Sequence, residues 1–269
     1  MELEKCKSII KHNIDEKNYL DNNLISKFYE DCNLQYGEQL VFDSWNVVKI
    51  VAKKLKALSV FLPMKDTELG AICYYRKKSI SYVFINSSIP EANMRFAFCH
   101  ELYHLLKPSE TIISKGLDMY LDTEYSESRD EMFANAFAGA ILMPEQKFIN
   151  KCKALGENID ELEKVVKLSE MFGAPYVSVV IRCYELNILT DKSKLYCLLH
   201  VSKDQLKDLY NEYGLNIALL KPRRIDQYQN LCSLVSDEAD LQLEDGELSQ
   251  YDKDYILNKL RQLYLKIKG

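Results

Sequence analysis

Residues 100–104, His-Glu-Leu-Tyr-His, constrain the fold of this chain more than any other segment. Two histidines four residues apart lie on one face of an α-helix, one turn from each other. If both imidazoles serve one site, this segment has to be helical. Its surroundings favour a helix, because Ser88 and Glu91 have the spacing of a capping box and Pro108 would stop the helix soon after the second histidine. We therefore predict a helix from Ser88 to about Leu106.

The same five residues have the composition of a zinc-peptidase motif. The imidazole nitrogens of His100 and His104 can bind one zinc ion together, and zinc lowers the pKa of a bound water toward about 7. Glu101 lies beside the first histidine, where its carboxylate can act as the general base for that water. The chain has only 4 histidines, so this spacing is improbable by chance. The alternative interpretation is a pair of exposed or core histidines without a metal.

A catalytic zinc ion needs a third protein ligand, and Glu131 is the best candidate. It lies on a second predicted helix, about 128–143, on the face that also carries Ala134, Asn135 and Ala138. Small residues on this face would permit close packing on the metal-binding helix. Asn135 could orient a ligand through a hydrogen bond.

The residues alone leave the third ligand open. Ser128 and Glu131 have capping-box spacing, so Glu131 could merely cap its own helix. Three nearby carboxylates are rivals on that basis: Glu124, Glu127 and Asp130. We expect no ligand role for three further residues, which have ordinary neighbourhoods or point away from the two motif histidines: His12, His200 and Cys99.

These two motifs resemble those of the ImmA/IrrE family of metallo-endopeptidases. The matching runs are His-Glu-Leu-Tyr-His at 100–104, Glu-Met-Phe-Ala-Asn-Ala-Phe-Ala at 131–138, Ile-Leu-Met-Pro at 141–144 and Arg-Phe-Ala-Phe at 95–98. The resemblance covers about 70–190. It implies that His100, His104 and Glu131 hold zinc and that Glu101 is the general base. It also implies a protein substrate, a helix-turn-helix repressor whose cleavage releases transcription of a mobile element or stress regulon.

We expect an α+β fold, with a helical zinc-peptidase core beside a small β-sheet. Two short aromatic and β-branched runs, 71–75 and 81–85, flank a basic turn and predict a hairpin. Helices are predicted at about 18–33 and from Asp43 or Ser44 to Leu58. The polar stretch at about 108–127 is long for a connection, which indicates a functional loop or lid.

Helical patterns follow position 158. Two helices that meet at Phe172-Gly173 resemble the helix-turn-helix-like segment of the same family. Arg182 is the only basic residue of the second of these helices, so we expect it to pack or to dock a partner rather than to bind DNA. The last helix has an apolar stripe from Ile256 to Ile267. We divide the chain into a peptidase domain (1–155), a helix-turn-helix-like segment (156–192) and a C-terminal recognition or sensing module (193–269).

Composition argues against several other classes of protein. A formal net charge of −5 gives no general attraction to nucleic acid or anionic membrane. No apolar run approaches the roughly 20 residues of a membrane span, and the N-terminus lacks the apolar core of a signal peptide. The 8 cysteines are scattered and form no paired metal motif, so we expect a cytoplasmic protein.

Two functions remain as alternatives to an endopeptidase. The first is a non-catalytic protein that binds a repressor, in which zinc would be structural or vestigial. The intact Glu101 argues against it, because a structural site does not need that carboxylate. The second is the toxin of a toxin–antitoxin pair built on the same fold.

Overall fold

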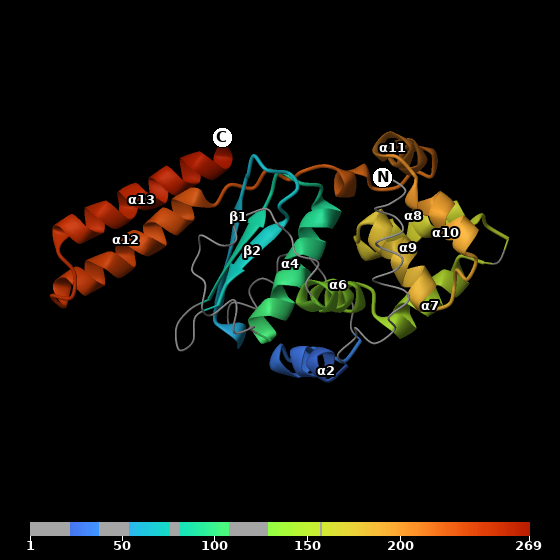
Figure 1. Cartoon of the computed structure of the whole chain (residues 1–269), viewed down its shortest axis with the longest axis horizontal. Helices are drawn as coiled ribbons and strands as arrows, with labels where there is room; N and C mark the ends of the chain where they lie inside the picture. Colours follow the sequence, from blue (N-terminus) through green and yellow to red (C-terminus); the bar gives the residue numbers. More distant parts are fainter. Residues whose placement is uncertain (1–21, 38–53, 76–80, 108–128, 157) are drawn as a thin grey trace.

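The computed structural model describes residues 22–37, 54–75, 81–107, 129–156 and 158–269, which form an α+β fold (Figure 1). Three strands, β1 (Ala57–Leu62), β2 (Ala71–Tyr74) and β3 (Ser81–Asn86), make one sheet in the order β1-β3-β2. The helices are α2 (Asn22–Asp31), α4 (Glu91–Leu106), α6 (Arg129–Leu142), α7 (Glu145–Ala154), α8 (Glu161–Phe172), α9 (Tyr176–Glu185), α10 (Lys192–Leu199), α11 (Lys203–Glu212), the 3₁₀ helix η2 (Ile217–Leu220), α12 (Tyr228–Glu244) and α13 (Gln250–Lys268).

The sheet confirms the predicted hairpin and adds a strand that the sequence did not reveal. Strands β2 and β3 are antiparallel, with Ala71 opposite Ile85, whereas β1 runs parallel to β3. The helix predicted to extend through Leu58 was wrong at that end, because Leu58 lies in β1; its earlier part falls within 38–53, outside the described residues. A short apolar run is compatible with either a helix or a strand. Here it forms a strand because its backbone can pair with β3.

The start of α4 differs from the predicted capping box. Pro90 is the N-cap and no side chain caps the helix. The N–H of Ser88 donates instead to the Asn86 side chain at 2.9 Å, and Glu91 accepts from Arg95 at 2.6 Å. The box was wrong because Ser88 lies two residues before the N-cap, too early to reach the first turn. The helix ends at Leu106, as predicted.

The buried Asn86 fixes the connection between the sheet and α4. Its side-chain oxygen accepts from the N–H groups of Met64 and Ser88, and its amide nitrogen donates to the carbonyls of Asp66 and Leu69 at 2.8 Å. Every donor and acceptor of this buried amide is thus used, as burial of a polar group requires. The start of α4 is thereby held against the end of β3.

The predicted pair of helices around Gly173 is present as α8 and α9. Asp160 caps α8 by accepting from the N–H of Leu162, and Gly173 ends it in the left-handed conformation with φ 57°. Arg182 on α9 is buried and donates to the Met143 carbonyl at 3.2 Å. It also forms an ion pair with Glu185 at 2.9 Å. The one basic residue of α9 is therefore engaged in contacts within the chain.

The segment 221–227 runs back across the sheet and joins the body of the molecule to α12. The N–H of Arg224 donates to the Ser87 carbonyl, and the Ser87 hydroxyl donates to the Ile225 carbonyl at 2.5 Å. Gln227 pairs with the edge strand β1, because it donates its N–H to Phe61 and accepts the Phe61 N–H on its side chain at 2.9 Å. These contacts attach the returning segment to the sheet.

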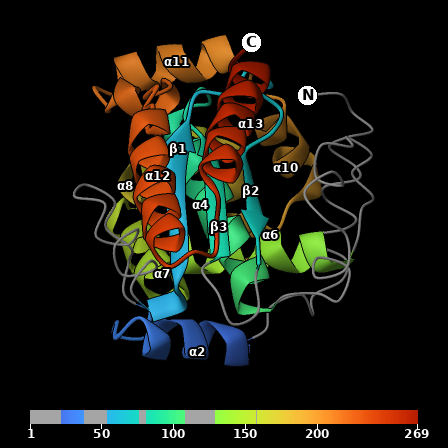
Figure 2. The same cartoon turned by 90° about the vertical axis from the view of Figure 1, so that its left-hand side faces the viewer.

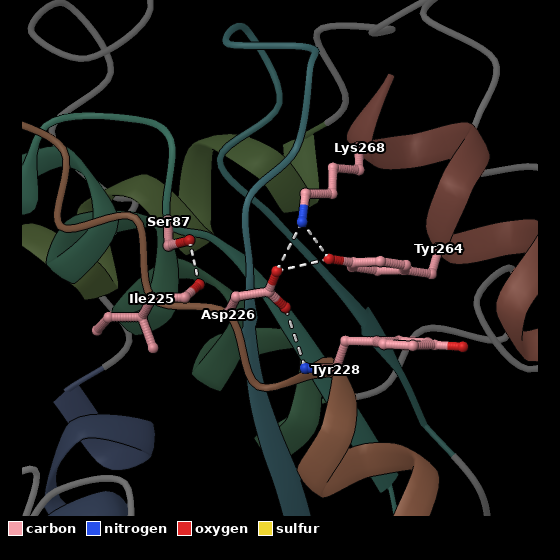
Figure 3. Close-up of polar contacts among 6 residues, drawn as sticks. All are labelled: Ser87, Ile225, Asp226, Tyr228, Tyr264 and Lys268. Carbon is pink, nitrogen blue, oxygen red and sulfur yellow. Dashed lines mark hydrogen bonds and ion pairs between the residues drawn. The ribbon is translucent and has the colours of Figure 1, made fainter.

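Helices α12 and α13 form a hairpin, here called the C-terminal arm (residues 228–268), that extends away from the sheet (Figures 1 and 2). A cluster around Asp226 fixes its base (Figure 3). This carboxylate accepts from the Tyr264 hydroxyl at 2.5 Å, the Lys268 ammonium at 3.0 Å and the Tyr228 N–H at 3.1 Å. The rings of Tyr228 and Tyr264 stack with centroids 3.9 Å apart. Both arm helices are therefore held at one point.

The predicted division into three domains remains a prediction. Buried side chains on both sides of the two proposed boundaries belong to one hydrophobic cluster, including Cys152, Val165, Leu195 and Tyr210. A second, smaller cluster lies between β1 and the base of the arm and contains Val60, Leu62, Met64 and Leu231. Among the described helices, none has the length and apolarity that crossing a membrane requires.

Substitution of Gly173 by alanine should destabilise the fold. The left-handed conformation costs a non-glycine residue about 1–2 kcal/mol, and the new methyl group would also collide with the Arg95 guanidinium. Gly214→Ala is a matched control, because Gly214 has φ 63° and open space around it. Chemical denaturation should give a larger loss of unfolding free energy for Gly173→Ala than for Gly214→Ala. Equal losses would show that the contact with Arg95 is irrelevant.

Candidate metal centre

Helices α4 and α6 pack against each other and bring the two sequence motifs together. Ala134 and Ala138 are fully buried on α6, so no bulky side chain separates the two helix backbones. The predicted small-residue face is therefore the face that contacts the rest of the core. His100 and His104 project from α4 toward Glu131 of α6.

Three side chains bring potential ligand atoms close together. Glu131 places one carboxylate oxygen 2.9 Å from His100 Nε2 and the other 3.4 Å from His104 Nε2. The two Nε2 atoms are 3.3 Å apart. Among the described residues these three form the group able to hold a metal ion.

The donor set fits zinc in both type and spacing. Ligand atoms about 2.0–2.1 Å from a tetrahedral zinc ion are about 3.3 Å from one another, close to the 2.9–3.4 Å separations observed here. Two imidazoles and one carboxylate also leave a fourth position for water, which is the pattern of a catalytic rather than a structural zinc site.

Asn135 orients His100 from one turn further along α6. Its Oδ1 lies 2.9 Å from His100 Nδ1. Because a side-chain carbonyl can only accept, Nδ1 carries a proton, which leaves Nε2 as the nitrogen that a metal ion would take. This tautomer suits metal binding, and a partner of this kind commonly fixes the ring of a metal-binding histidine.

The charges of the three groups are strongly coupled. Burial would lower the pKa of His100, but the hydrogen bond that the imidazole donates to Glu131 and the charges of Glu101 and Glu131 raise it. Burial would raise the pKa of Glu131, but hydrogen bonds and charges from both histidines hold it well below its usual range. Glu131 is therefore ionised at neutral pH, as a metal ligand has to be.

Glu101 lies buried between α4 and the sheet, next to Cys73 of β2. Burial, together with the charge and hydrogen bond of Glu101, raises the pKa of the Cys73 thiol well above its ordinary value. The thiol is therefore protonated and donates to the carboxylate. Sequence reasoning missed this contact, although the alternating burial of β2 places Cys73 on the inner face of the sheet.

The other candidate residues do not join this group in the described structure. Asp130 is exposed on the neighbouring position of α6. His200 ends α10, where its Nδ1 contacts the Tyr196 carbonyl at 2.6 Å. Cys99 is buried, which raises the pKa of its thiol. The remaining candidates, His12, Glu124 and Glu127, and the predicted loop at 108–127 lie outside the described residues.

Comparison with known protein families agrees with this geometry. Residues 52–184 match the family model described as the IrrE N-terminal-like domain, a family of peptidases. These residues form an ImmA/IrrE-family domain. No curated protein and no solved structure matches the chain.

The ImmA/IrrE-family domain contains both helices of the candidate metal centre and extends into α9, as far as Tyr184. It therefore includes the sheet, the candidate metal centre and most of the helix-turn-helix-like pair. The family is one of metallopeptidases, which agrees with a triad of two histidines and one carboxylate. The C-terminal arm lies outside the matched residues.

Glu131→Ala should weaken zinc binding more than the roughly 10–100-fold that loss of an outer hydrogen-bond partner costs, because the predicted site uses Glu131 as a direct ligand. Asp130→Ala is the matched control, since Asp130 is an exposed carboxylate on the adjacent position. Competition with a chromogenic zinc chelator measures both affinities. Equal affinities of Glu131→Ala and the parent chain would remove Glu131 from the metal site.

Proposed function

We propose that this chain is a zinc-dependent endopeptidase that hydrolyses a peptide bond within a protein substrate. The observation that carries the proposal is the buried carboxylate of Glu101 on the residue next to His100, beside a triad that fits zinc. A site that only held a structural metal would not need a second, buried carboxylate beside the triad, because burial of an unused carboxylate is unfavourable.

Each residue of the site has a distinct role in this proposal. His100, His104 and Glu131 hold the zinc ion, and Asn135 keeps the His100 ring in the required tautomer. When bound, zinc supplies Lewis-acid chemistry that polarises the scissile carbonyl and acidifies water. Glu101 accepts the proton of the attacking water and returns it to the nitrogen of the leaving amine. The Cys73 thiol holds the Glu101 carboxylate in place.

The substrate we propose is a helix-turn-helix repressor whose cleavage releases transcription, and the reaction would take place in the cytoplasm. Membership of a peptidase family supports a protein substrate. The packing of Arg182 within the chain supports a reading of α8 and α9 as a structural or docking element rather than a DNA-binding one.

Glu101→Gln should abolish cleavage while zinc binding persists. The amide is nearly the same size but cannot accept the proton, and general-base assistance contributes roughly 10²–10⁴-fold. The substrate to test is a helix-turn-helix protein encoded beside this chain, and the readouts are substrate length, zinc content and transcription of the repressed gene. Glu145→Gln, which changes an exposed carboxylate of α7, is the control.

The combination of readouts separates a peptidase from a protein that only sequesters a repressor. A peptidase loses both cleavage and derepression in Glu101→Gln and keeps its zinc. Full derepression by Glu101→Gln with an uncut repressor would overturn the enzymatic proposal and leave the metal site intact.

A further inference from the structure

Exposed apolar side chains are concentrated on the C-terminal arm. Of the large hydrophobic residues that are exposed in the described structure, all but Tyr36 and Met171 lie on α12 or α13. They are Leu234, Leu241, Tyr251, Tyr255, Ile256, Leu263 and Leu265. Helix α13 has no buried residue along its whole length. A monomeric protein rarely concentrates apolar surface in this way, which marks the arm as an interaction surface.

Helix α13 carries two separate rows of residues without charge. The inner row contains Leu260, Tyr264 and Ile267, which pack on the cluster at the base of the arm. The outer row repeats with spacings of four and three residues, the period of a coiled-coil seam. Its members are all exposed: Tyr251, Tyr255, Asn258, Gln262 and Leu265. The inner row packs against other residues of the same chain. The outer row stays exposed in the described part of the chain.

Charges flank the outer row and change sign along the helix. The first half of α13 carries Asp252 and Asp254, and its one basic residue, Lys253, is paired with Asp240 of α12 at 2.5 Å. The charged residues of the second half are all basic, namely Lys259, Arg261, Lys266 and Lys268. At about 100° per residue, these charges fall on both sides of the outer row. Such flanking charges determine the orientation of a helix pair.

We propose that the outer row of α13 binds the same row of a second copy of this chain in antiparallel orientation. Centred on Asn258, this pairing places Tyr251 opposite Leu265 of the partner subunit and Tyr255 opposite Gln262 of the partner subunit. The acidic half of each helix then faces the basic half of the other. Parallel pairing would place like charges together, which is unfavourable.

Helix α12 strengthens the case for a second copy. The far end of the arm is acidic, with Asp237, Glu238, Asp240 and Glu244 on α12 and no basic residue on that helix. In an antiparallel pair this end lies beside the basic half of α13 of the partner subunit. Charge complementarity is therefore present within one sequence, and the interface is self-complementary, as a twofold dimer requires. The two bodies would lie at opposite ends of a four-helix arrangement.

Sedimentation equilibrium of the full chain tests the proposal. We expect a monomer–dimer equilibrium over about 1–100 µM, and at least about a tenfold weaker association for Tyr255→Lys, equivalent to about 1.4 kcal/mol. The new ammonium would lie in the row, close to Arg261 of the partner subunit. Met171→Lys, a change at an exposed apolar residue outside the arm, should leave association unchanged. Circular dichroism should be the same for all three chains, since neither residue is buried.

Oxidative crosslinking tests the orientation. A mixture of Tyr251→Cys and Leu265→Cys chains should form a disulfide between positions 251 and 265, identified by peptide mapping, with the parent chain as the background control. Crosslinks that join position 251 to itself instead would overturn the antiparallel arrangement. A chain that stays monomeric at about 100 µM, or a dimer unaffected by Tyr255→Lys, would overturn the proposal. A monomer whose arm binds a lysine-rich peptide would assign the surface to a basic partner and would overturn it too.

Discussion

The close approach of α4 and α6 is the constraint on which the candidate metal centre depends. Ala134 and Ala138 are fully buried where the helices meet. On the same helix, Glu131 lies about one turn before Ala134, and Asn135 directly follows Ala134. Each carboxylate oxygen of Glu131 contacts a different imidazole, at 2.9 Å for His100 and 3.4 Å for His104. Asn135 contacts Nδ1 of His100 at 2.9 Å. A larger residue at 134 or 138 would separate the helices and move both contacts at once, because packed interiors have little free volume.

Helical periodicity explains why most of this site could be predicted. The positions His100 and His104, and then Glu131, Ala134 and Asn135, are related by one-turn spacings that a single sequence displays directly. What the sequence left open was whether Glu131 faces the histidines or its own helix end, since both follow from the same residues. Only the packing of one helix on the other decides this, and it directs the carboxylate at the imidazoles.

The features that escaped prediction are those that depend on distant partners. Leu58 belongs to a strand because β3 offers its edge to β1, and Glu91 bonds Arg95 and, at 3.4 Å, Arg223 instead of capping a helix. Cys73 contacts Glu101 because the sheet packs against α4. For Leu58 and Cys73 the local sequence permits more than one arrangement, and a residue far along the chain selects one of them. Local patterns carry no information about that partner.

The C-terminal arm shows another limit of local sequence patterns. An apolar stripe at the end of the chain predicts an amphipathic helix, but it does not say whether the helix covers its own core or another molecule. The structure assigns Leu260 and Tyr264 to contacts at the base of the arm, where Asp226 holds Tyr264 and Lys268. Because these contacts fix the rotation of α13 about its axis, Tyr255 and Leu265 have to face outward. The contacts around Asp226 that complete the internal packing therefore also leave the outer row of α13 facing a partner.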